Sequence, residues 1–273
     1  MPRKLADVAM DLIVSRLPNP YTRSFDGLRI TFNLRDRYLS RSLLFRGKWE
    51  PYETSLVEKL VSPGDTVADI GANIGYYSLI LASKVKEVHS FEPDPANFSY
   101  LRFNIQQNRV GNVILVNKAV SDQSRCAMLY LSEDNYGDHN LWAKGDRKAV
   151  EVETTSLDDY FQIMPKRLDF AKMDIQGGEW NAFKGMKQIV EQSRSLKVIT
   201  EFWPEGLKGM GSSPIALLKL LADYGFDLFR LDEEKKRLNR LPESGFEDLA
   251  QMKSSTNLLC LRNKGVGIAL PKP

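Results

Sequence analysis

The chain has 273 residues, 42% of them hydrophobic, which is enough to bury the core of one large α/β domain with appendages. Its 38 Lys and Arg residues against 35 Asp and Glu residues leave a net charge of +3 without a block of like charges, which argues against a nucleic-acid partner. No apolar run approaches the roughly 20 residues that span a bilayer, and the two distant cysteines form no disulfide framework, so we expect a cytoplasmic protein without a membrane span.

Residues 1–60 are expected to form an extension of helix and strand packed on the main domain. In residues 1–20 the apolar positions share one helix face and are interrupted by Asp7, Asp11 and Arg16, unlike the continuous apolar core of a signal peptide. The segment "LRITFNL" alternates apolar and polar residues as a half-buried strand does, and "SLVEKLVSPGD" predicts a helix that stops at its proline and glycine.

From Thr66 onward, short apolar runs alternate with helical segments, which is typical of βαβ units and a parallel sheet. The rhythm is interrupted at about 125–155 by an insertion, where "CAMLYLSE" and "VEVETTSL" predict two antiparallel strands around a polar loop. It then resumes through "LDFAKMDI", "LKVITEF", "FDLFRL" and "NLLCLR". We therefore predict an α/β domain at 61–263 with a seven-stranded, mainly parallel sheet and helices on both faces, followed by a tail at 264–273.

The most informative run is "VADIGANIGYYSL", where an apolar strand turns through two glycines into a helix. In an open α/β sheet, ligands bind at the carboxyl ends of the strands, and the first strand-to-helix turn carries the glycines. A dinucleotide fingerprint requires a glycine where this chain has Asn73, and a phosphate loop requires Lys and Ser or Thr where it has Tyr76 and Tyr77. Neither phosphate-binding turn fits.

The next predicted strand ends in Glu92, about twenty residues beyond the first glycine. A carboxylate at that place can accept both hydroxyls of a ribose. The turn and Glu92 together predict a site for a nucleoside without a pyrophosphate.

Four motifs in this order, "DIGANIGYYSLILA", "SFEPDPANFSYLRFNIQQN", "VNKAVSD" and "AKMDIQGGEWNAFKGM", resemble the FkbM-type S-adenosylmethionine-dependent methyltransferases. "WEPYET" and "EFWPEGL" are also similar to that family. The resemblance implies a Rossmann-like methyltransferase fold with one antiparallel strand, S-adenosylmethionine as cofactor, and O-methylation of a hydroxyl on a small molecule or sugar. In one place the chain departs from the family, since Gln176 stands where members often carry glutamate.

The resemblance, together with strand-end geometry, gives the expected cofactor site. The amino-acid end of the cofactor is expected at Asp69, Gly71, Asn73 and Gly75; the ribose at Glu92, with Phe91 and Pro93 as apolar walls; and the adenine at Asn117, Lys118 and Ala119. An ordinary strand end is an equally good interpretation of the last three. Ala72, Tyr76 and Asp174 are also expected to bind the cofactor.

Three residues are candidates for catalysis. Asp174 ends the fourth strand of the domain at the ligand edge, where it can orient the acceptor or take its proton, although an aspartate there can also cap the next helix. Glu201 ends the fifth strand and is a weaker candidate. His139 lies in the polar loop of the insertion and has an ordinary pKa near 6.5, which suits a general base, although a solvated loop histidine is the commoner case.

No transition-metal site is visible, since only two histidines and no cysteine cluster are present. The predicted acceptor is a small molecule or carbohydrate hydroxyl, not a nucleic acid, because no basic stripe with interleaved aromatics is seen. Two other functions stay open. A nucleoside-binding or partner-binding module with reduced catalysis is kept open by Gln176, and an NAD-dependent dehydrogenase is disfavoured by Asn73.

Overall fold

A computed structural model describes residues 5–143, 145–162 and 167–262, so the predicted tail at 264–273 lies outside the described residues. Within these ranges eight strands form one sheet, in the order β12-β11-β13-β10-β9-β3-β4-β5. Its parallel part consists of β3 (Thr66–Ile70), β4 (Glu87–Phe91), β5 (Val113–Val116), β9 (Phe170–Met173) and β10 (Lys197–Phe202). The predicted mainly parallel α/β sheet is confirmed.

At the other end of the sheet, two strands run against the rest. β13 (Thr256–Arg262) is antiparallel to both β10 and β11 (Phe226–Asp232), and β12 (Arg237–Arg240) is antiparallel to β11. β13 is the reversed strand that the family resemblance implies. β12 adds an eighth strand, because the charged run "DEEKKR" is the turn of a hairpin that folds back on β11.

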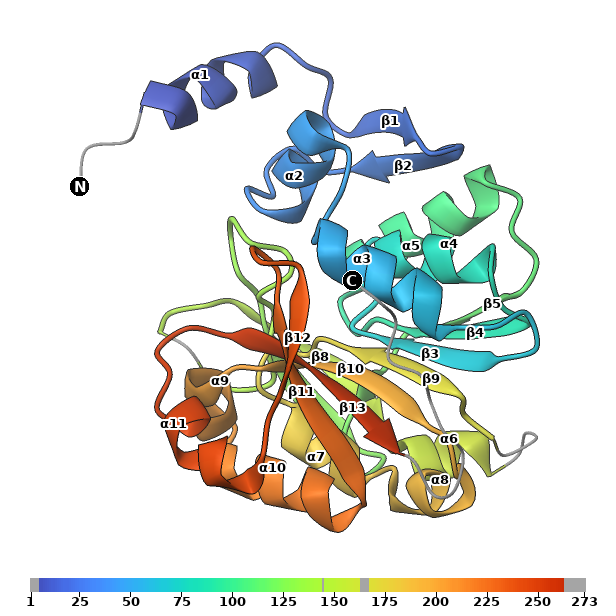
Figure 1. Ribbon diagram of the computed structural model, residues 1–273. Helices are drawn as coiled ribbons and strands as arrows, with labels where there is room; N and C mark the ends of the chain where they lie inside the picture. The colour runs from blue at the N-terminus through green and yellow to red at the C-terminus, as the bar shows by residue number, and fades with distance from the viewer. Residues whose placement is uncertain (1–4, 144, 163–166, 263–273) are drawn as a thin grey trace.

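One face of the sheet is covered by α3 (Pro51–Leu60), α4 (Tyr76–Ala82) and α5 (Pro95–Gln107), which Figure 1 shows on one side of the strands. The apolar cluster on this face includes Leu56, Leu79 and Leu101, each at most 2% exposed. Because both faces are covered, the central strands are buried along almost their whole length, as their continuous apolar runs predict.

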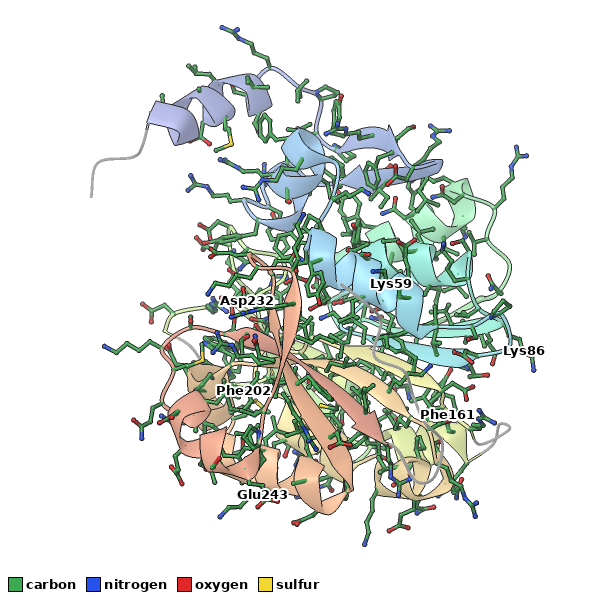
Figure 2. All side chains as sticks on the ribbon, in the orientation of Figure 1. Lys59, Lys86, Phe161, Phe202, Asp232 and Glu243 are labelled. Carbon is green, nitrogen blue, oxygen red and sulfur yellow. The ribbon has the colours of Figure 1, made fainter. Side chains whose placement is uncertain are left out.

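The opposite face is covered by α6 (Leu157–Phe161), α7 (Glu179–Lys184), α8 (Lys187–Gln192), α9 (Pro204–Gly209), α10 (Pro214–Asp223) and α11 (Phe246–Ala250), with the 3-10 turn Glu243–Gly245 before α11. Phe161 and Phe202 lie on this side of the sheet in Figure 2, whereas Lys59 lies on α3 on the other side. The sequence predicts one helix where α7 and α8 stand. The chain breaks at Gly185, where a Cβ would lie 2.2 Å from the carbonyl oxygen of Ser121.

The N-terminal extension contains α1 (Leu5–Val14), the hairpin β1 (Tyr21–Phe25) and β2 (Leu28–Phe32), and α2 (Leu39–Arg46). The sequence predicts α1 and the strand at β2, but not β1 or α2. Figure 1 shows the hairpin and α2 above α3 to α5, with α1 at the far end of the extension. Asn104 fixes the hairpin to the domain, because its side chain accepts from Thr31 N at 2.8 Å and donates to Thr31 O at 3.0 Å.

The insertion forms a separate small sheet of β6 (Ala119–Val120), β7 (Cys126–Tyr130) and β8 (Ala149–Thr155). β7 and β8 pair antiparallel, as predicted. The loop between them meets the turn after β3, since Asn73 donates to the carbonyl oxygen of Tyr136 at 3.4 Å. The loop therefore lies at the carboxyl ends of the parallel strands, where ligands bind in such sheets.

Candidate functional site

The turn after β3 is tightly packed. Gly71 has φ +84°, and a Cβ there would lie 2.0 Å from the carbonyl oxygen of Asp174, so only glycine fits. Gly75 has φ +91°, and its Cβ would meet the Leu101 side chain at 2.7 Å. The two glycines of the sequence motif thus let the turn pass close to the end of β9 and let α4 pack on α5.

Glu92, at the end of β4, is 5% exposed and holds two backbone segments. One carboxylate oxygen accepts from Asn73 N at 2.8 Å and the other from Asp94 N at 2.9 Å. Each oxygen keeps a free lone pair, which a ligand hydroxyl can use. Burial raises the pKa of Glu92 to about 8.

Glu92 opens into a narrow cavity, here called the apolar cavity, of about 50 Å³. It is lined by Gly71, Asn73, Phe91, Glu92, Pro93, Asn97, Lys118, Ala119, Val120, Leu129, Tyr136, Gly137, His139, Asn140, Leu141, Asp174, Ile175 and Gly178. Ligand sites are commonly about 300–1,000 Å³. The loop of the insertion that lines the cavity is held by Asn97, which donates to the Tyr136 carbonyl at 2.9 Å.

Most residues predicted to bind a cofactor line this cavity, but five do not: Asp69, Ala72, Gly75, Tyr76 and Asn117. Asn117 donates to the carbonyl oxygens of Glu92 and Pro93 at 2.8 and 3.1 Å, so it supports the loop after β4 and is absent from the lining. Ala72 and Tyr76 line a second cavity, together with Asp69. Asp69 is 1% exposed, accepts from Ser78 Oγ at 2.5 Å, and has its pKa raised to about 6 by burial.

His139 lines the apolar cavity and is absent from the lining of the second one. Its Nδ1 accepts from Ser132 N at 2.9 Å, and its Nε2 lies 3.9 Å from the Asp94 carboxylate. Burial lowers its pKa. These contacts tie His139 to the loop that lines the apolar cavity, and its candidacy as a general base stays a prediction.

The second cavity, here called the polar cavity, measures about 400 Å³. Its lining comprises Tyr38, Leu39, Trp49, Glu50, Asp69, Gly71, Ala72, Asn73, Tyr76, Tyr77, Asn135, Gly137, Lys172, Asp174, Gln176, Glu201, Ser255, Thr256 and Asn257. Gly71, Asn73, Gly137 and Asp174 belong to both linings, so the two cavities adjoin at these residues.

Two of the predicted catalytic residues are brought together here. The side-chain amide of Gln176 donates to Asp174 Oδ1 at 2.7 Å and to Glu201 Oε2 at 3.1 Å. Burial raises the pKa of Glu201 well above its usual range, and the charge of Asp174 adds to this. Asp174 does not cap α7, whose first residue Glu179 instead accepts from Ile175 N at 3.1 Å.

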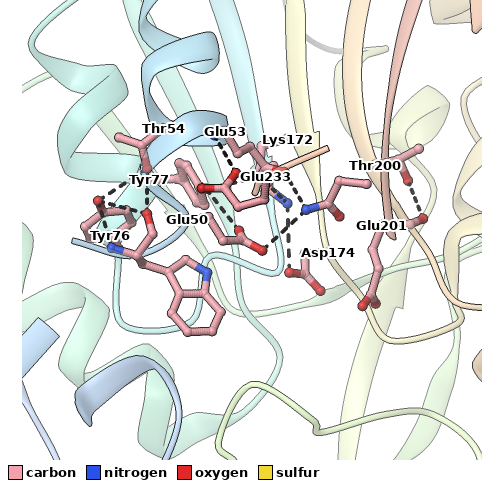
Figure 3. A network of polar contacts seen from close by, with 12 residues as sticks. Glu50, Glu53, Thr54, Tyr76, Tyr77, Lys172, Asp174, Thr200, Glu201 and Glu233 are labelled. Carbon is pink, nitrogen blue, oxygen red and sulfur yellow. Dashed lines mark hydrogen bonds and ion pairs between the residues drawn. The ribbon is translucent and has the colours of Figure 1, made fainter. Parts of the chain in front are cut away.

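The sequence analysis missed a group of buried charges beside Asp174. Lys172 is 1% exposed, and its ammonium lies 3.1 Å from Glu53 and 3.8 Å from Asp174. Burial alone would lower the Lys172 pKa, but the surrounding carboxylates outweigh burial and raise it, so the side chain stays charged. Figure 3 shows these ion pairs, with Glu50 and Glu201 beside them.

Glu50 is the second residue that was missed. It adopts the left-handed conformation, with φ +40° and ψ +70°, which is unusual for glutamate and is often found at functional sites. Its carboxylate accepts from Tyr77 at 3.2 Å and from Asn257 at 3.4 Å. Burial and the neighbouring Glu53 raise the Glu50 pKa to about 8. A signal for the group exists in the sequence, since Lys172 interrupts the otherwise apolar strand "FAKM".

The polar cavity thus combines one permanent cation with several carboxyl groups whose pKa is raised toward neutral pH. Near neutral pH the acids with the highest pKa are largely protonated, so they can donate a hydrogen bond to a bound ligand. In the part of the chain that the structure describes, no three His, Cys, Asp or Glu side chains are placed to hold a metal ion. No helix within the described ranges is both long and apolar enough to cross a membrane.

Comparison with known proteins gives a family match over the centre of the chain. Residues 69–228 match the family described as methyltransferase FkbM domain. The 31-O-demethyl-FK506 methyltransferase FkbM of Streptomyces tacrolimicus is 44% identical over 64 residues, which cover 23% of this chain and 24% of that protein. The tRNA (guanine(37)-N(1))-methyltransferase Trm5b of Pyrococcus abyssi is 30% identical over 89 residues, or 33% of this chain and 25% of that protein.

Among solved structures, the methyltransferase FkbM of Methylobacillus flagellatus has a TM-score of 0.47 and 16% identity, covering 93% of this chain and 58% of that one. The matches to both curated relatives span about a quarter of the length of those proteins.

Proposed function

The chain belongs to the FkbM methyltransferase family, and we propose that it is an S-adenosylmethionine-dependent O-methyltransferase acting on a hydroxyl of a small molecule, sugar or natural-product glycoside. One observation carries the proposal: Asp174 lines both the apolar and the polar cavity, and it is the only carboxylic acid in both linings among the described residues. A carboxylate therefore stands between a space suited to a nucleoside and a space suited to a polar acceptor. The name of the Streptomyces tacrolimicus relative points to an oxygen as acceptor.

S-adenosylmethionine is the methyl donor of this family, and the residues present fit it. Glu92 offers free lone pairs to the ribose hydroxyls, and Phe91 supplies an apolar wall for the adenine. The turn at Gly71 has no room for a side chain, so its backbone can approach a ligand closely. Asp69 faces the polar cavity, where it can meet the ammonium of the amino-acid end.

When bound, the cofactor supplies an electrophilic methyl group. The protein must then place the acceptor oxygen in line with it and remove the hydroxyl proton. We propose that Asp174 orients the hydroxyl and accepts its proton, whereas Glu50 and Glu201, whose raised pKa keeps them largely protonated near neutral pH, donate hydrogen bonds to the acceptor. Positioning should contribute more than proton removal, since orientation of reactants can supply about 7–11 kcal/mol against roughly 10²–10⁴ in rate from a general base.

Under the proposed function, different parts of the chain bind the methyl donor and the acceptor. Residues 61–263 bind the donor, whereas Tyr38, Trp49 and Glu50 of the extension wall the acceptor space. The insertion at 125–155 covers the donor.

The test is incubation with cofactor carrying a labelled methyl group and a panel of sugars, polyketides and RNA. We expect label in a hydroxyl of a sugar or polyketide, lost in Asp174→Asn at unchanged fold. RNA is included among the acceptors because part of the chain is similar to a tRNA methyltransferase. Transfer to RNA would replace the acceptor class, and cofactor binding without transfer to any acceptor would favour a binding module.

A further inference from the structure

A third cavity lies next to the polar cavity, on the N-terminal extension. It measures about 380 Å³ and is here called the arginine cavity. Its lining consists of Met10, Arg37, Tyr38, Arg41, Ser42, Phe45, Arg46, Trp49 and Asp134. Tyr38 and Trp49 belong to the linings of both this cavity and the polar cavity, so the two adjoin.

Three guanidinium groups meet in the arginine cavity. Asp11 pairs with two of them, lying 3.8 Å from Arg37 and forming an ion pair with Arg41. Arg46 is exposed and makes no ion pair with any described residue. The Nε of Arg41 is buried and has no hydrogen-bond partner among the described residues. Arg46 and the Nε of Arg41 can therefore still donate hydrogen bonds to an anion.

The charge of the extension supports an anionic ligand. Residues 1–48 contain ten Lys and Arg against four Asp and Glu, whereas the rest of the chain has 28 against 31. The excess positive charge is thus concentrated in the segment that carries the arginine cavity, beside a cavity rich in carboxyl groups. An anion is attracted to the first cavity and repelled by the second.

We propose that the arginine cavity binds a phosphate group of the methyl acceptor, so that the acceptor is a phosphorylated sugar or polyol whose hydroxyl reaches Asp174 in the polar cavity. Arginine suits phosphate because its planar guanidinium donates two parallel hydrogen bonds to a pair of oxygens. Tyr38 and Trp49 offer flat faces to the sugar ring between the two sites. This inference deepens the proposed function and rests on it for the identity of the acceptor, but anion binding can be measured without methyl transfer.

Calorimetric titration of the full chain with inorganic phosphate, glucose 1-phosphate and glucose tests the inference. We expect both phosphates to bind below about 10 mM and glucose not to bind in that range. The double variant R37Q/R46Q should weaken phosphate binding by about tenfold or more, and higher salt should weaken it in the wild type. R16Q is the matched control, because Arg16 is exposed on the same extension and does not line the cavity.

A variant with a higher phosphate affinity tests the inference without relying on a loss that misfolding could also cause. Asp134 is exposed and lines the arginine cavity, so removal of its negative charge in D134N should strengthen phosphate binding by several-fold. Vesicles containing phosphatidylglycerol form a further arm, and binding to them but not to glucose 1-phosphate would assign the phosphate to a lipid-linked acceptor. Equal phosphate affinity in wild type, R37Q/R46Q and D134N, or no phosphate and vesicle binding at all, would overturn the inference. Affinity for S-adenosylhomocysteine, measured separately, reports on the proposed function alone.

Discussion

Gln176 donates a hydrogen bond of 2.7 Å to the Asp174 carboxylate, and the same amide nitrogen reaches Glu201 at 3.1 Å. The amide of Gln176 is neutral and has two hydrogens to donate, so it joins the two acids Asp174 and Glu201 through hydrogen bonds. Asp174 lines both the apolar and the polar cavity. A glutamate at position 176 would instead place a third carboxyl group beside those of Asp174 and Glu201, and it could not donate to both when ionised.

Gln176→Glu should therefore shift the pH dependence of turnover. The added carboxyl group makes loss of a proton from the acids of this cavity less favourable, so the rising limb of the rate moves upward by roughly one pH unit, with about tenfold less activity below it. Rate against pH with an identified acceptor is the measurement. Gln192→Glu, an exposed site on α8, is the control for the charge change alone. An unchanged profile would contradict the bridging role.

Gly71→Ala should destabilise the fold and abolish cofactor binding. The added methyl group would sit 2.0 Å from the Asp174 carbonyl oxygen at a positive φ, so the turn or the end of β9 must shift. We expect a loss of about 2–4 kcal/mol in unfolding free energy, measured by urea denaturation. Gly64→Ala is matched to it, because its Cβ meets nothing within 4 Å, and it should be close to neutral. Equal stability of the two variants would refute the close approach.

Glu92→Gln should weaken binding of S-adenosylhomocysteine by about 100-fold. The substitution keeps the shape of the side chain but replaces two charge-assisted hydrogen bonds to the ribose, each contributing about 1.5–3 kcal/mol. Calorimetry would measure this, with Glu87→Gln at the start of the same strand as control. Because the pKa of Glu92 is about 8 before the ligand binds, wild-type affinity should also rise with pH up to that value. Wild-type affinity in the variant would exclude Glu92 as the ribose ligand.

His139→Ala separates two roles for that residue. If His139 shapes the loop over the apolar cavity, the variant loses the hydrogen bond from Ser132 N, and cofactor affinity should fall by about five- to tenfold. Turnover at saturating cofactor should then change little. The base predicted from the sequence would give the opposite pattern, with nearly intact affinity and a rate lowered by about 10² or more.

Stability should fall as pH rises from about 5 to 8. Burial raises the pKa of Glu50 and Glu92 from 4.5 to about 8, so between these values the folded chain holds protons that the unfolded chain has released. Unfolding then releases protons and becomes more favourable at higher pH, by about 1.4 kcal/mol per pH unit for each group. Urea unfolding at several pH values measures the slope. Glu92→Gln should make it shallower, and a stability that rises across this window would contradict the burial of these acids.

The part of the fold that could be predicted from sequence is the part made of local signals. Alternating apolar and helical runs gave the parallel sheet, and the rule that ligands bind at carboxyl strand ends brought Glu92 and Asp174 to one edge. β1, α2 and the hairpin to β12 were not predicted, because their apolar positions are too few to show a period.

The buried charges could not be predicted for a different reason. Glu50 precedes a helix and Lys172 lies within a strand, more than a hundred residues later. Their proximity is a product of tertiary packing, which places Glu53 of α3 beside Lys172 of β9, and the two motifs that contain Glu50 and Lys172 lie far apart in the sequence. A lysine inside a buried strand is nevertheless costly unless it is paired, and it should prompt a search for a carboxylate partner.

Trp49 and Glu50 lie outside residues 69–228, the segment that matches the family, and both line the polar cavity. Under the proposed function these two residues belong to the wall of the acceptor space, so exchange of the first sixty residues is expected to change the acceptor while the matched segment is kept. A chimera that carries the 1–60 segment of another FkbM protein on this core is a direct way to change what is methylated without rebuilding the catalyst.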